Sequence, residues 1–358
     1  MRGIVFDGER LRLTEALEVR APGPGEVRVR VLRSGLCHSD LNMVKGGLIG
    51  TPVVLGHEAA GEVIELGPET SGFALGDAVL VSPQAPCGEC RECHRGTPVN
   101  CDATWGMAAQ QPFTWEGRPT YSFSNVSSFA GEIVVRADQL HHAGALPPEQ
   151  AALIGCAVST GYSAAKILGG IGKGDRVVVI GIGGIGVNAI AGARINGAEE
   201  ILAVDLNPDK EPAARHAGAT RFLAASRGMD AAALAQAIAE AGAPLDVAIE
   251  CSGAPVAAAA AFDAVKRGGK VVLIGQTKPG ARLDLSLDAL TFGREVVGML
   301  NSGTDPHRDY PEMIALAASG ELDLASQVTR VWPLAEFEQA IAALENGEVI
   351  RAVLDHTA

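Results

Sequence analysis

The feature that most constrains this chain is the stretch from residue 177 to residue 205. An apolar segment, Val177–Ile180, leads into a turn with the pattern G-x-G-x-x-G, and an Ala-rich segment and a second apolar run follow, ending at Asp205. Strand, glycine turn, helix, strand and a terminal acid about 20 residues after the turn form the dinucleotide-binding pattern of a parallel α/β sheet. We therefore predict that a dinucleotide binds here.

The glycines of this turn have separate physical roles. Gly181 permits the tight turn out of the strand, Gly183 lets backbone approach a pyrophosphate, and Gly186 lets the helix lie close to the sheet. Free N–H groups at the helix N-terminus favour the phosphates. We expect Asp205 to bond the ribose hydroxyls and to repel a 2′-phosphate, so NAD is favoured over NADP. The residues of the turn assigned to the cofactor are Gly181, Gly183, Gly184, Ile185 and Gly186.

Composition disfavours several classes of function. The formal net charge of −13 argues against nucleic acid or an anionic membrane as a partner. A membrane span over residues 177–193 is also disfavoured, because this segment is rich in glycine and is bounded by Lys173 and Arg194. The first residues lack the apolar core of a signal peptide, so we expect a cytoplasmic protein with a small-molecule partner.

The 358 residues suggest two domains. Residues 26–31 alternate strictly between polar and apolar, as in a strand with one buried face, and the N-terminal region is predicted to be a compact β domain. From about residue 158, apolar strands alternate with Ala-rich helices, which predicts a doubly wound parallel sheet. We expect its strands near residues 176–180, 201–205, 245–250, 270–275 and 294–299, and its helices near 184–196, 209–217, 230–241 and 255–267. Beyond residue 300 we expect helices near 310–319 and 334–346 and a strand over 349–354.

Four of the seven cysteines crowd into one short segment: Cys87, Cys90, Cys93 and Cys101. The spacing C-x2-C-x2-C-x7-C puts four thiolates within reach of one tetrahedral ion, and we predict a structural zinc on a lobe of about residues 86–102. An iron–sulfur cluster, disulfides or free thiols are the alternatives; the Cys-Pro typical of ferredoxins is missing, because Asp102 follows the last cysteine. Four sulfur ligands would close the coordination sphere, so this metal would hold a loop together without doing chemistry.

Three other residues are candidates for a second metal site. Cys37, His57 and Cys156 would supply two thiolates and one imidazole and leave a fourth position open, which is the layout of a catalytic zinc. Spacing alone does not assemble them, because a lone cysteine is most often a small packed residue. Cys251 is interpreted as such a packed residue at the end of a strand.

Taken together, these residues resemble the zinc-dependent alcohol dehydrogenases of the medium-chain dehydrogenase/reductase superfamily. The resemblance covers nearly the whole chain and rests on residues 35–40, 56–63, the four-cysteine lobe, 155–161, the glycine turn and 347–351. It implies a GroES-like β-barrel catalytic domain formed by residues 1–157 and 301–358, and a Rossmann NAD-binding domain over 158–300. It also implies a catalytic zinc on Cys37, His57 and Cys156 besides the structural one, hence two zinc ions per subunit.

The resemblance implies roles for residues around this zinc. Ser39 matches a position whose hydroxyl touches the alcohol and the proton path. Asp40 matches a carboxylate that orients the histidine ligand, and Glu58 one that lies behind the metal. Thr160 matches a position that packs against the nicotinamide, as does Ile185 of the glycine turn.

The remaining implied cofactor contacts come from cations. His38 and Arg351 match contacts to the pyrophosphate, and Lys210 matches a contact to the adenosine ribose beside Asp205. One position departs from the family: many members carry a proton-relaying histidine where this chain has Asn42, and an amide cannot accept and release a proton near neutral pH. The proton is therefore expected to leave through Ser39, the ribose and water.

The implied reaction is the reversible oxidation of an alcohol to an aldehyde or ketone with NAD. Two alternatives remain open. One is a dehydrogenase for a thiol adduct of formaldehyde or for an aryl alcohol, with tightly held NAD. The other is a non-redox, cyanohydrin-type lyase on the same scaffold, since one fold can host several functions. A homodimer or homotetramer is also implied, with an edge strand near residues 295–299 pairing across a two-fold axis.

Overall fold

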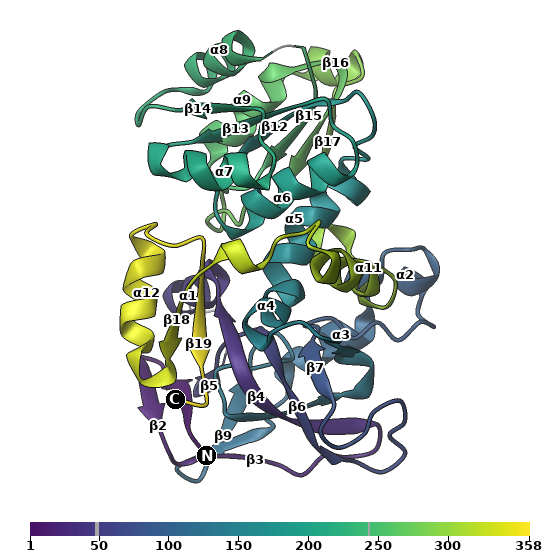
Figure 1. Cartoon of the computed structure of the whole chain (residues 1–358), viewed down its shortest axis with the longest axis vertical. Coiled ribbons are helices and arrows are strands. Elements are labelled where there is room, and N and C mark those ends of the chain that lie inside the picture. The colour runs from purple at the N-terminus through teal and green to yellow at the C-terminus, as the bar shows by residue number, and fades with distance from the viewer. Residues whose placement is uncertain (47–49, 243) are drawn as a thin grey trace. The chain divides into compact units, whose positions relative to one another are not determined.

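The computed structural model describes residues 1–46, 50–242 and 244–358. The chain divides into two compact units, one formed by Met1–Cys156 with Asp305–Ala358 and the other by Ala157–Thr304 (Figure 1). The expected domain boundaries lay at residues 157/158 and 300/301. Residues 301–304 group with the second unit because their side chains hydrogen-bond to residues 159–163 of that unit.

The first unit is built on two sheets. Its seven-stranded sheet runs in the order β11-β7-β6-β4-β19-β18, with β10 also paired to β4. The bounds are β4 Glu26–Leu36, β6 Glu58–Leu66, β7 Ala78–Val81, β10 Glu132–Arg136, β11 Leu140–His142, β18 Val328–Pro333 and β19 Arg351–Asp355. The C-terminal β19 pairs antiparallel with β4, so the end of the chain completes the N-terminal β unit.

The second sheet of this unit runs in the order β2-β1-β5-β9-β8-β3. Its strands are β1 Gly3–Phe6, β2 Leu11–Thr14, β3 Leu17–Val19, β5 Val53–Val54, β8 Phe113–Trp115 and β9 Arg118–Ser122. The helices of the unit are α1 His38–Gly46, α2 Arg91–His94, α3 Asp102–Gly106, α4 Pro148–Leu153, α11 Pro306–Ser319 and α12 Phe337–Glu345.

The alternation expected over residues 26–31 is visible in β4. Val27, Val29 and Val31 are buried, whereas the residues between them are less so, as a strand with one face on the core requires. The same core receives Trp332 from β18 and Leu354 from β19, so apolar residues from both ends of the chain share one interior.

The second unit contains the predicted parallel sheet, and this prediction is confirmed. Its strand order is β14-β13-β12-β15-β16-β17, and every pairing is parallel. The strands are β12 Arg176–Ile180, β13 Glu200–Asp205, β14 Arg221–Ala224, β15 Leu245–Glu250, β16 Val265–Leu273 and β17 Glu295–Val297. Its helices are α5 Ser159–Ser163, α6 Gly184–Ile195, α7 Glu211–Ala217, α8 Ala231–Ala241, α9 Pro255–Ala264 and α10 Leu287–Thr291.

Helices cover both faces of this sheet. Apolar residues of α8 and α9 share a core with Val178 and Leu202 on one face, and Figure 1 shows α6 and α7 on the other. The strand order reverses between β13 and β15 on either side of β12, and ligands of such sheets bind at this switch point, beyond the carboxyl ends of the strands. The glycine turn leaves β12 at that end, so the fold puts it where a dinucleotide is expected.

In the first unit, α11 begins at Pro306 and not near residue 310, and β19 spans Arg351–Asp355 and not 349–354. Two details of the second unit also differ from the expectations. The edge strand β14 was missed, because a short strand that is only partly buried gives little periodicity to recognise. The helix expected over 255–267 ends at Ala264, since Val265 already pairs with Leu245 as the start of β16.

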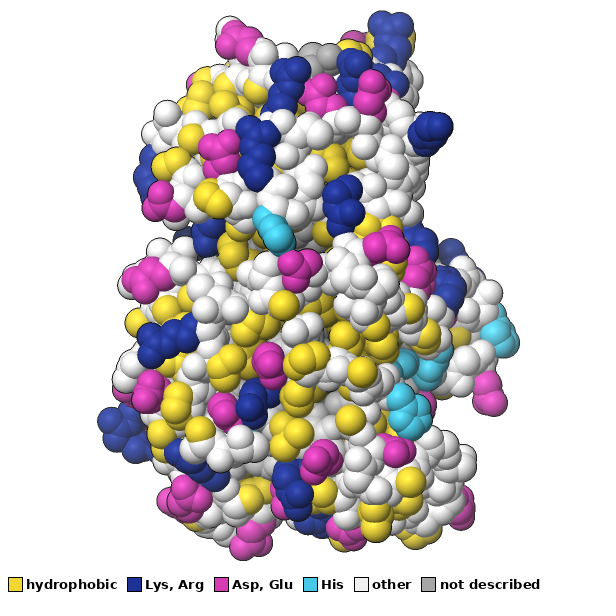
Figure 2. Space-filling view, in the orientation of Figure 1, with side chains coloured by type: hydrophobic (Ala, Val, Ile, Leu, Met, Phe, Trp, Pro, Cys, Tyr) yellow, Lys and Arg dark blue, Asp and Glu magenta, His cyan; other side chains and the backbone are white. Residues whose placement is uncertain are grey.

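The surface charge and one long apolar helical stretch bear on whether nucleic acid or a membrane could be a partner. On the face shown in Figure 2, basic (dark blue) and acidic (magenta) side chains are interspersed among the residues drawn in colour. Among the described residues, the helical stretch Pro148–Leu168 has the length and composition to cross a membrane, with a hydropathy of 1.3; 78% of its apolar window is buried inside the structure, as in a core helix.

Candidate metal and cofactor sites

The first candidate site joins residues that are far apart in the sequence. The ligand atoms of Cys37, His57, Glu58 and Cys156 all lie within 4.8 Å of one another. Cys37 directly follows β4, and His57 directly precedes β6, and the antiparallel pairing of these strands sets Gly35 opposite Glu58. Cys156 arrives on a π-helical segment, Ile154–Val158, a local geometry that is frequent at functional sites.

The close approach of β4 and β6 at Gly35 depends on the absence of a side chain on this residue. A Cβ built on Gly35 would lie 2.0 Å from Glu58 Oε2, so only glycine lets the two strands meet with the carboxylate between them. The strand pairing, and not the sequence spacing, brings the donor atoms together.

Asp40 organises two of the candidate ligands. This buried carboxylate accepts hydrogen bonds from the backbone N–H of Cys37 at 3.1 Å and of Gly56 at 3.0 Å. It also lies 3.0 Å from His57 Nδ1. With Nδ1 bonded to a carboxylate, the imidazole presents Nε2 as its ligand atom, and Nε2 lies 3.3 Å from Cys156 Sγ.

The electrostatics of the cluster fit a bound cation. The Cys156 thiol and the His57 side chain hold the pKa of Cys37 well below its ordinary value. The adjacent Cys37 sulfur and burial raise the pKa of Cys156 well above its ordinary value. Burial alone would lower the pKa of His57, but Asp40 beside it raises that pKa. Arg351 supplies one positive charge near the buried Cys37 and the half-buried Cys156, and the S, N, S donor set of Cys37, His57 and Cys156 suits zinc.

Glu58 and Arg351 form a buried ion pair beside these ligands. Burial raises the pKa of Glu58. The Glu58 Oε1 and Arg351 Nε atoms are buried without a hydrogen-bond partner, so each retains bonding capacity toward a ligand. The Glu58 carboxylate therefore lies within reach of a metal held by Cys37, His57 and Cys156 and could serve as a fourth ligand. The pyrophosphate contact of Arg351 stays a prediction.

The positions on α1 are arranged around Cys37. Ser39 Oγ lies 3.6 Å from Cys37 Sγ, so its hydroxyl is adjacent to one candidate metal ligand. His38 and Asn42 are exposed, four residues apart on the helix. The pyrophosphate contact of His38 stays a prediction.

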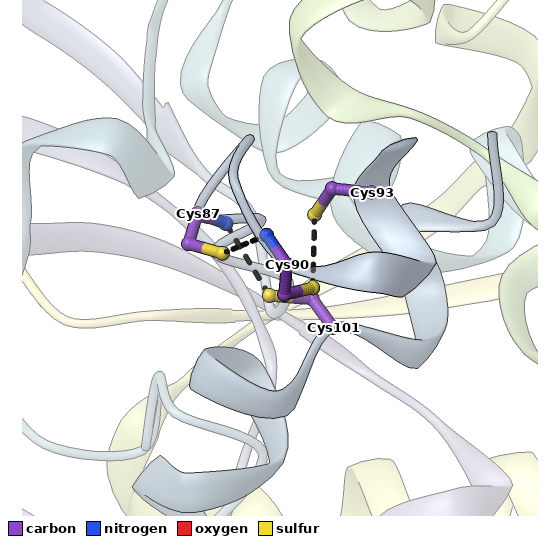
Figure 3. A group of neighbouring side chains, drawn as sticks. All are labelled: Cys87, Cys90, Cys93 and Cys101. Carbon is purple, nitrogen blue, oxygen red and sulfur yellow. Dashed lines mark hydrogen bonds between the residues drawn. The ribbon is translucent and has the colours of Figure 1, made fainter. Parts of the chain in front are cut away.

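The second candidate site is the four-cysteine lobe (Figure 3). Its four sulfur atoms lie within 4.8 Å of one another, and all four cysteines are free thiols. The backbone N–H of Cys90 donates to Cys87 Sγ at 3.3 Å, and that of Cys87 donates to Cys101 Sγ at 3.3 Å. Backbone N–H groups aimed at sulfur stabilise thiolates, so the loop is prepared for a metal.

The thiols of the four-cysteine lobe have unequal pKa values. Burial would raise the pKa of Cys101, but backbone N–H groups of Cys87, Thr104 and Ala103 lower it to about 6. Burial and the neighbouring sulfurs raise the pKa of Cys93 to about 12. The unequal pKa values follow from packing several thiols together, and a tetrahedral cation would remove the mutual repulsion of four thiolates.

The third candidate site is the glycine turn between β12 and α6. A Cβ on Gly186 would lie 2.0 Å from the carbonyl oxygen of Gly181, whereas one on Gly183 would meet no atom within 4 Å. Gly186 therefore serves packing, and the space over Gly183 is open to a ligand. Gly184 and Ile185 form the first turn of α6, with their N–H groups at the end that attracts anions.

Asp205 closes the other side of the turn. Its Oδ2 accepts from the N–H of Ile182 at 2.6 Å, and its Oδ1 accepts from the N–H of Asn207 at 2.8 Å. Burial lowers the pKa of the nearby Lys210, against the attraction of Asp205. The carboxylate is thus fixed at the end of β13 with lone pairs remaining for ribose hydroxyls.

Thr160 lies on α5, which packs against the start of α6. A Cβ on Gly161 would lie only 2.3 Å from the carbonyl oxygen of Ile185, so the two predicted nicotinamide contacts are neighbours in space. Thr160 Oγ1 donates to Asn301 Oδ1 at 2.5 Å. Sequence reasoning missed Asn301; the Asn-Ser-Gly run at 301–303, typical of left-handed turns, could have pointed to it.

Comparisons with known proteins match both halves of the chain. Residues 23–145 match the alcohol dehydrogenase GroES-like domain, and residues 184–319 match the zinc-binding dehydrogenase domain. An NDMA-dependent alcohol dehydrogenase from Amycolatopsis methanolica is 35% identical, over 96% of this chain and 95% of that protein. An S-(hydroxymethyl)glutathione dehydrogenase from a Synechocystis strain is 32% identical, over 98% and 97%. The solved benzyl alcohol dehydrogenase from Acinetobacter calcoaceticus superposes with a TM-score of 0.89 at 25% identity, over 99% of this chain and 98% of that one.

Proposed function

Since this chain belongs to the zinc-dependent alcohol dehydrogenase family of the medium-chain dehydrogenase/reductase superfamily, we propose that it oxidises an alcohol reversibly to an aldehyde or ketone with NAD, using one catalytic and one structural zinc per subunit. The expected oxidoreductase class and the expected GroES-like and Rossmann fold are both confirmed by these relatives. The observation that carries the finer proposal is the convergence of Cys37, His57 and Cys156 beside Glu58.

In the proposed site, zinc and NAD would have one set of roles, and the side chains around them another. Zinc held by the three ligands would supply Lewis acidity toward the alcohol oxygen, and NAD would supply the hydride acceptor. Asp40 keeps a proton on His57 Nδ1 and so keeps Nε2 directed at the metal position. Glu58 and Arg351 neutralise each other behind the ligands, which limits the net charge in this buried place.

The alcohol proton must leave through a side chain that can both accept and donate. Ser39 Oγ is such a group, and it lies beside the ligand Cys37. We propose that Ser39 Oγ accepts the proton of the alcohol and passes its own hydroxyl proton on toward solvent. Asn42 lies exposed on the same helix and cannot take part as a base.

The preference for NAD over NADP rests on Asp205. Both of its oxygens are held by backbone N–H groups, so the carboxylate cannot swing away from an incoming 2′-phosphate. Repulsion between the two anions supports selection of the unphosphorylated ribose.

Zinc content and turnover test this proposal together. Wild-type protein should contain two zinc ions per subunit by plasma mass spectrometry and should produce the absorbance of reduced nicotinamide with a panel of alcohols. Cys156→Ala should lose one zinc and abolish turnover while NAD still binds in calorimetry. Cys251→Ala, which lies outside both cysteine groups, is the matched control and should keep both ions. Retained turnover in Cys156→Ala would contradict the catalytic role.

A second candidate stays within the same chemistry. The relative named S-(hydroxymethyl)glutathione dehydrogenase supports a thiol adduct of formaldehyde as substrate, and tightly held NAD stays a prediction. Nucleotide released on denaturing the purified protein, measured by chromatography, distinguishes held from exchanged NAD. Turnover of S-(hydroxymethyl)glutathione distinguishes the substrates, and cleavage of a cyanohydrin without nicotinamide reduction would favour a lyase.

We also propose that the chain forms a homodimer or homotetramer through β17. This strand is the edge of the parallel sheet of the second unit. Large apolar side chains near it in sequence are exposed, and the exposed fraction is 78% for Leu287 and 56% for Phe292. Light scattering of purified protein gives the subunit number, and a monomer would contradict the proposal. A cytoplasmic location is proposed as well, because six of the seven cysteines lie in two candidate metal groups, which require the reduced thiols that a reducing compartment maintains.

A further inference from the structure

A strained turn lies at the end of the cofactor unit, shortly after β17. Asn301, Ser302 and Gly303 all have positive φ, at 48°, 53° and 72°. Two consecutive non-glycine residues in the left-handed region are costly, and such strain gathers where the surrounding structure requires one geometry. Asparagine tolerates this region better than most residues, which fits its place at the head of the turn.

Side-chain hydrogen bonds hold the turn at residues 301–304 against α5. Ser302 Oγ donates to the carbonyl oxygen of Thr160 at 2.7 Å. Thr304 Oγ1 lies 2.9 Å from Ser163 Oγ and 2.6 Å from the carbonyl oxygen of Asn301. Asn301 and Ser302 are both buried, so the turn is held in place and not merely resting on the surface.

The side-chain amide of Asn301 is only half satisfied. Its Oδ1 accepts from Ser159 Oγ at 3.1 Å and from Thr160 Oγ1 at 2.5 Å. Its Nδ2 is buried without a hydrogen-bond partner, and the residue is only 9% exposed. An unpaired buried donor is unfavourable and rare in native proteins, so a partner from a ligand is the natural completion.

The position of Asn301 in the sheet identifies that ligand. The parallel strands end at one edge, with Asp205 at the end of β13 on one side of β12 and Asn301 beyond β17 on the other. A dinucleotide bound across the switch point has its pyrophosphate at the glycine turn. With the adenosine ribose at Asp205, the nicotinamide end extends toward α5, where Gly161 touches Ile185 and Thr160 touches Asn301.

We propose that Asn301 Nδ2 donates a hydrogen bond to the carboxamide oxygen of the nicotinamide ring, making Asn301 a cofactor-recognition residue. The inference rests on the proposed NAD dependence and deepens it. The carboxamide is the one neutral group of this end of the cofactor that offers both a carbonyl oxygen and N–H donors. It therefore complements the unpaired atom of Asn301 in either orientation of the side-chain amide.

Calorimetric titration with NAD and with ADP-ribose, which lacks the nicotinamide, tests this proposal. Asn301→Asp keeps an oxygen for the two hydroxyls and tolerates the left-handed backbone, but it replaces the Nδ2 donor. Asn301→Ala removes the whole amide. In both variants the Kd for NAD should rise about fivefold to tenfold, the size of one neutral hydrogen bond, while the Kd for ADP-ribose stays within about twofold.

Ser163→Ala is the matched control, because it removes the hydroxyl that bonds Thr304 of the same turn and leaves Asn301 with both of its partners. It should bind both nucleotides as the wild type does. Equal weakening of NAD and ADP-ribose in the Asn301 variants, or no weakening of either, would overturn the role of Asn301. Failure of the wild type to bind either nucleotide would instead overturn the proposed NAD dependence.

Discussion

Asp40 lies 3.0 Å from His57 Nδ1, and the same carboxylate holds the backbone N–H groups of Cys37 and Gly56. One buried side chain therefore fixes the ring orientation of one candidate ligand and the chain position of another. The arrangement predicts that Asp40→Asn weakens zinc affinity about tenfold to 100-fold, because an outer carboxylate orients the histidine and raises its basicity.

Competition with a chromophoric chelator measures this affinity without any need for turnover. Only one of the two zinc ions should become easier to remove, since hydrogen bonds join the four cysteines of the lobe to one another, whereas Asp40 bonds Cys37, Gly56 and His57. Zinc retention equal to wild type would show that Asp40 has only a packing role.

The two candidate zinc sites differ in how far the sequence alone predicts them. The four-cysteine lobe is local, and its spacing alone indicated one ion, whereas Cys37, His57 and Cys156 could be joined only through the family resemblance. The physical link between them is the pairing of β4 with β6 and the close approach at Gly35, which spacing does not encode. Asn301 was missed for a similar reason: the Asn-Ser-Gly run indicates a left-handed turn, but the unpaired side-chain donor appears only in three dimensions.

Stability should fall in mild acid because of the buried His141 and the half-buried His356. Burial lowers the pKa of His141 to about 4, with His307 and His142 adding to the effect, and burial lowers that of His356 to about 4 as well. Between the ordinary value of 6.5 and about 4, the unfolded chain binds protons that the folded chain does not, so falling pH favours unfolding. The loss should reach at most about 3 kcal/mol for each residue and level off below the folded pKa.

Urea titrations from pH 7 to pH 4 measure this dependence. His141→Gln should reduce the slope of the unfolding free energy against pH over that range. The exposed His216→Gln should leave the slope unchanged. An identical slope in His141→Gln and wild type would contradict the assignment.

The four-cysteine lobe should contribute to stability only when its metal is bound. Cys101 is fully buried and its thiolate is favoured by backbone N–H groups, so Cys101→Ser should release one zinc and lower the Tm by several degrees. Limited proteolysis should then cut within residues 87–101, while wild-type protein resists. An unchanged cleavage pattern and Tm would indicate that the loop is held by its own packing.

The proton path makes a prediction at Asn42. Replacing it with histidine adds a group that titrates near neutral pH on the exposed face of α1. Asn42→His should shift the pH dependence of kcat toward lower pH, because a new base can take the proton that Ser39 now passes to water. The quantity to compare is the apparent pKa of the kcat profile; if it does not move, the proton does not travel along this helix.

Two glycines of the same turn should respond in opposite ways to the same substitution. A Cβ on Gly186 would lie 2.0 Å from the Gly181 carbonyl oxygen, which is backbone and cannot move aside, so Gly186→Ala should destabilise the cofactor unit by about 1–3 kcal/mol. A Cβ on Gly183 meets no protein atom within 4 Å, so Gly183→Ala should leave the Tm unchanged. It should instead weaken NAD binding at least tenfold, because the methyl group occupies the space that the pyrophosphate needs. Thermal melts and NAD titrations of both variants separate the effects, and tight NAD binding by a stable Gly183→Ala protein would place the pyrophosphate elsewhere.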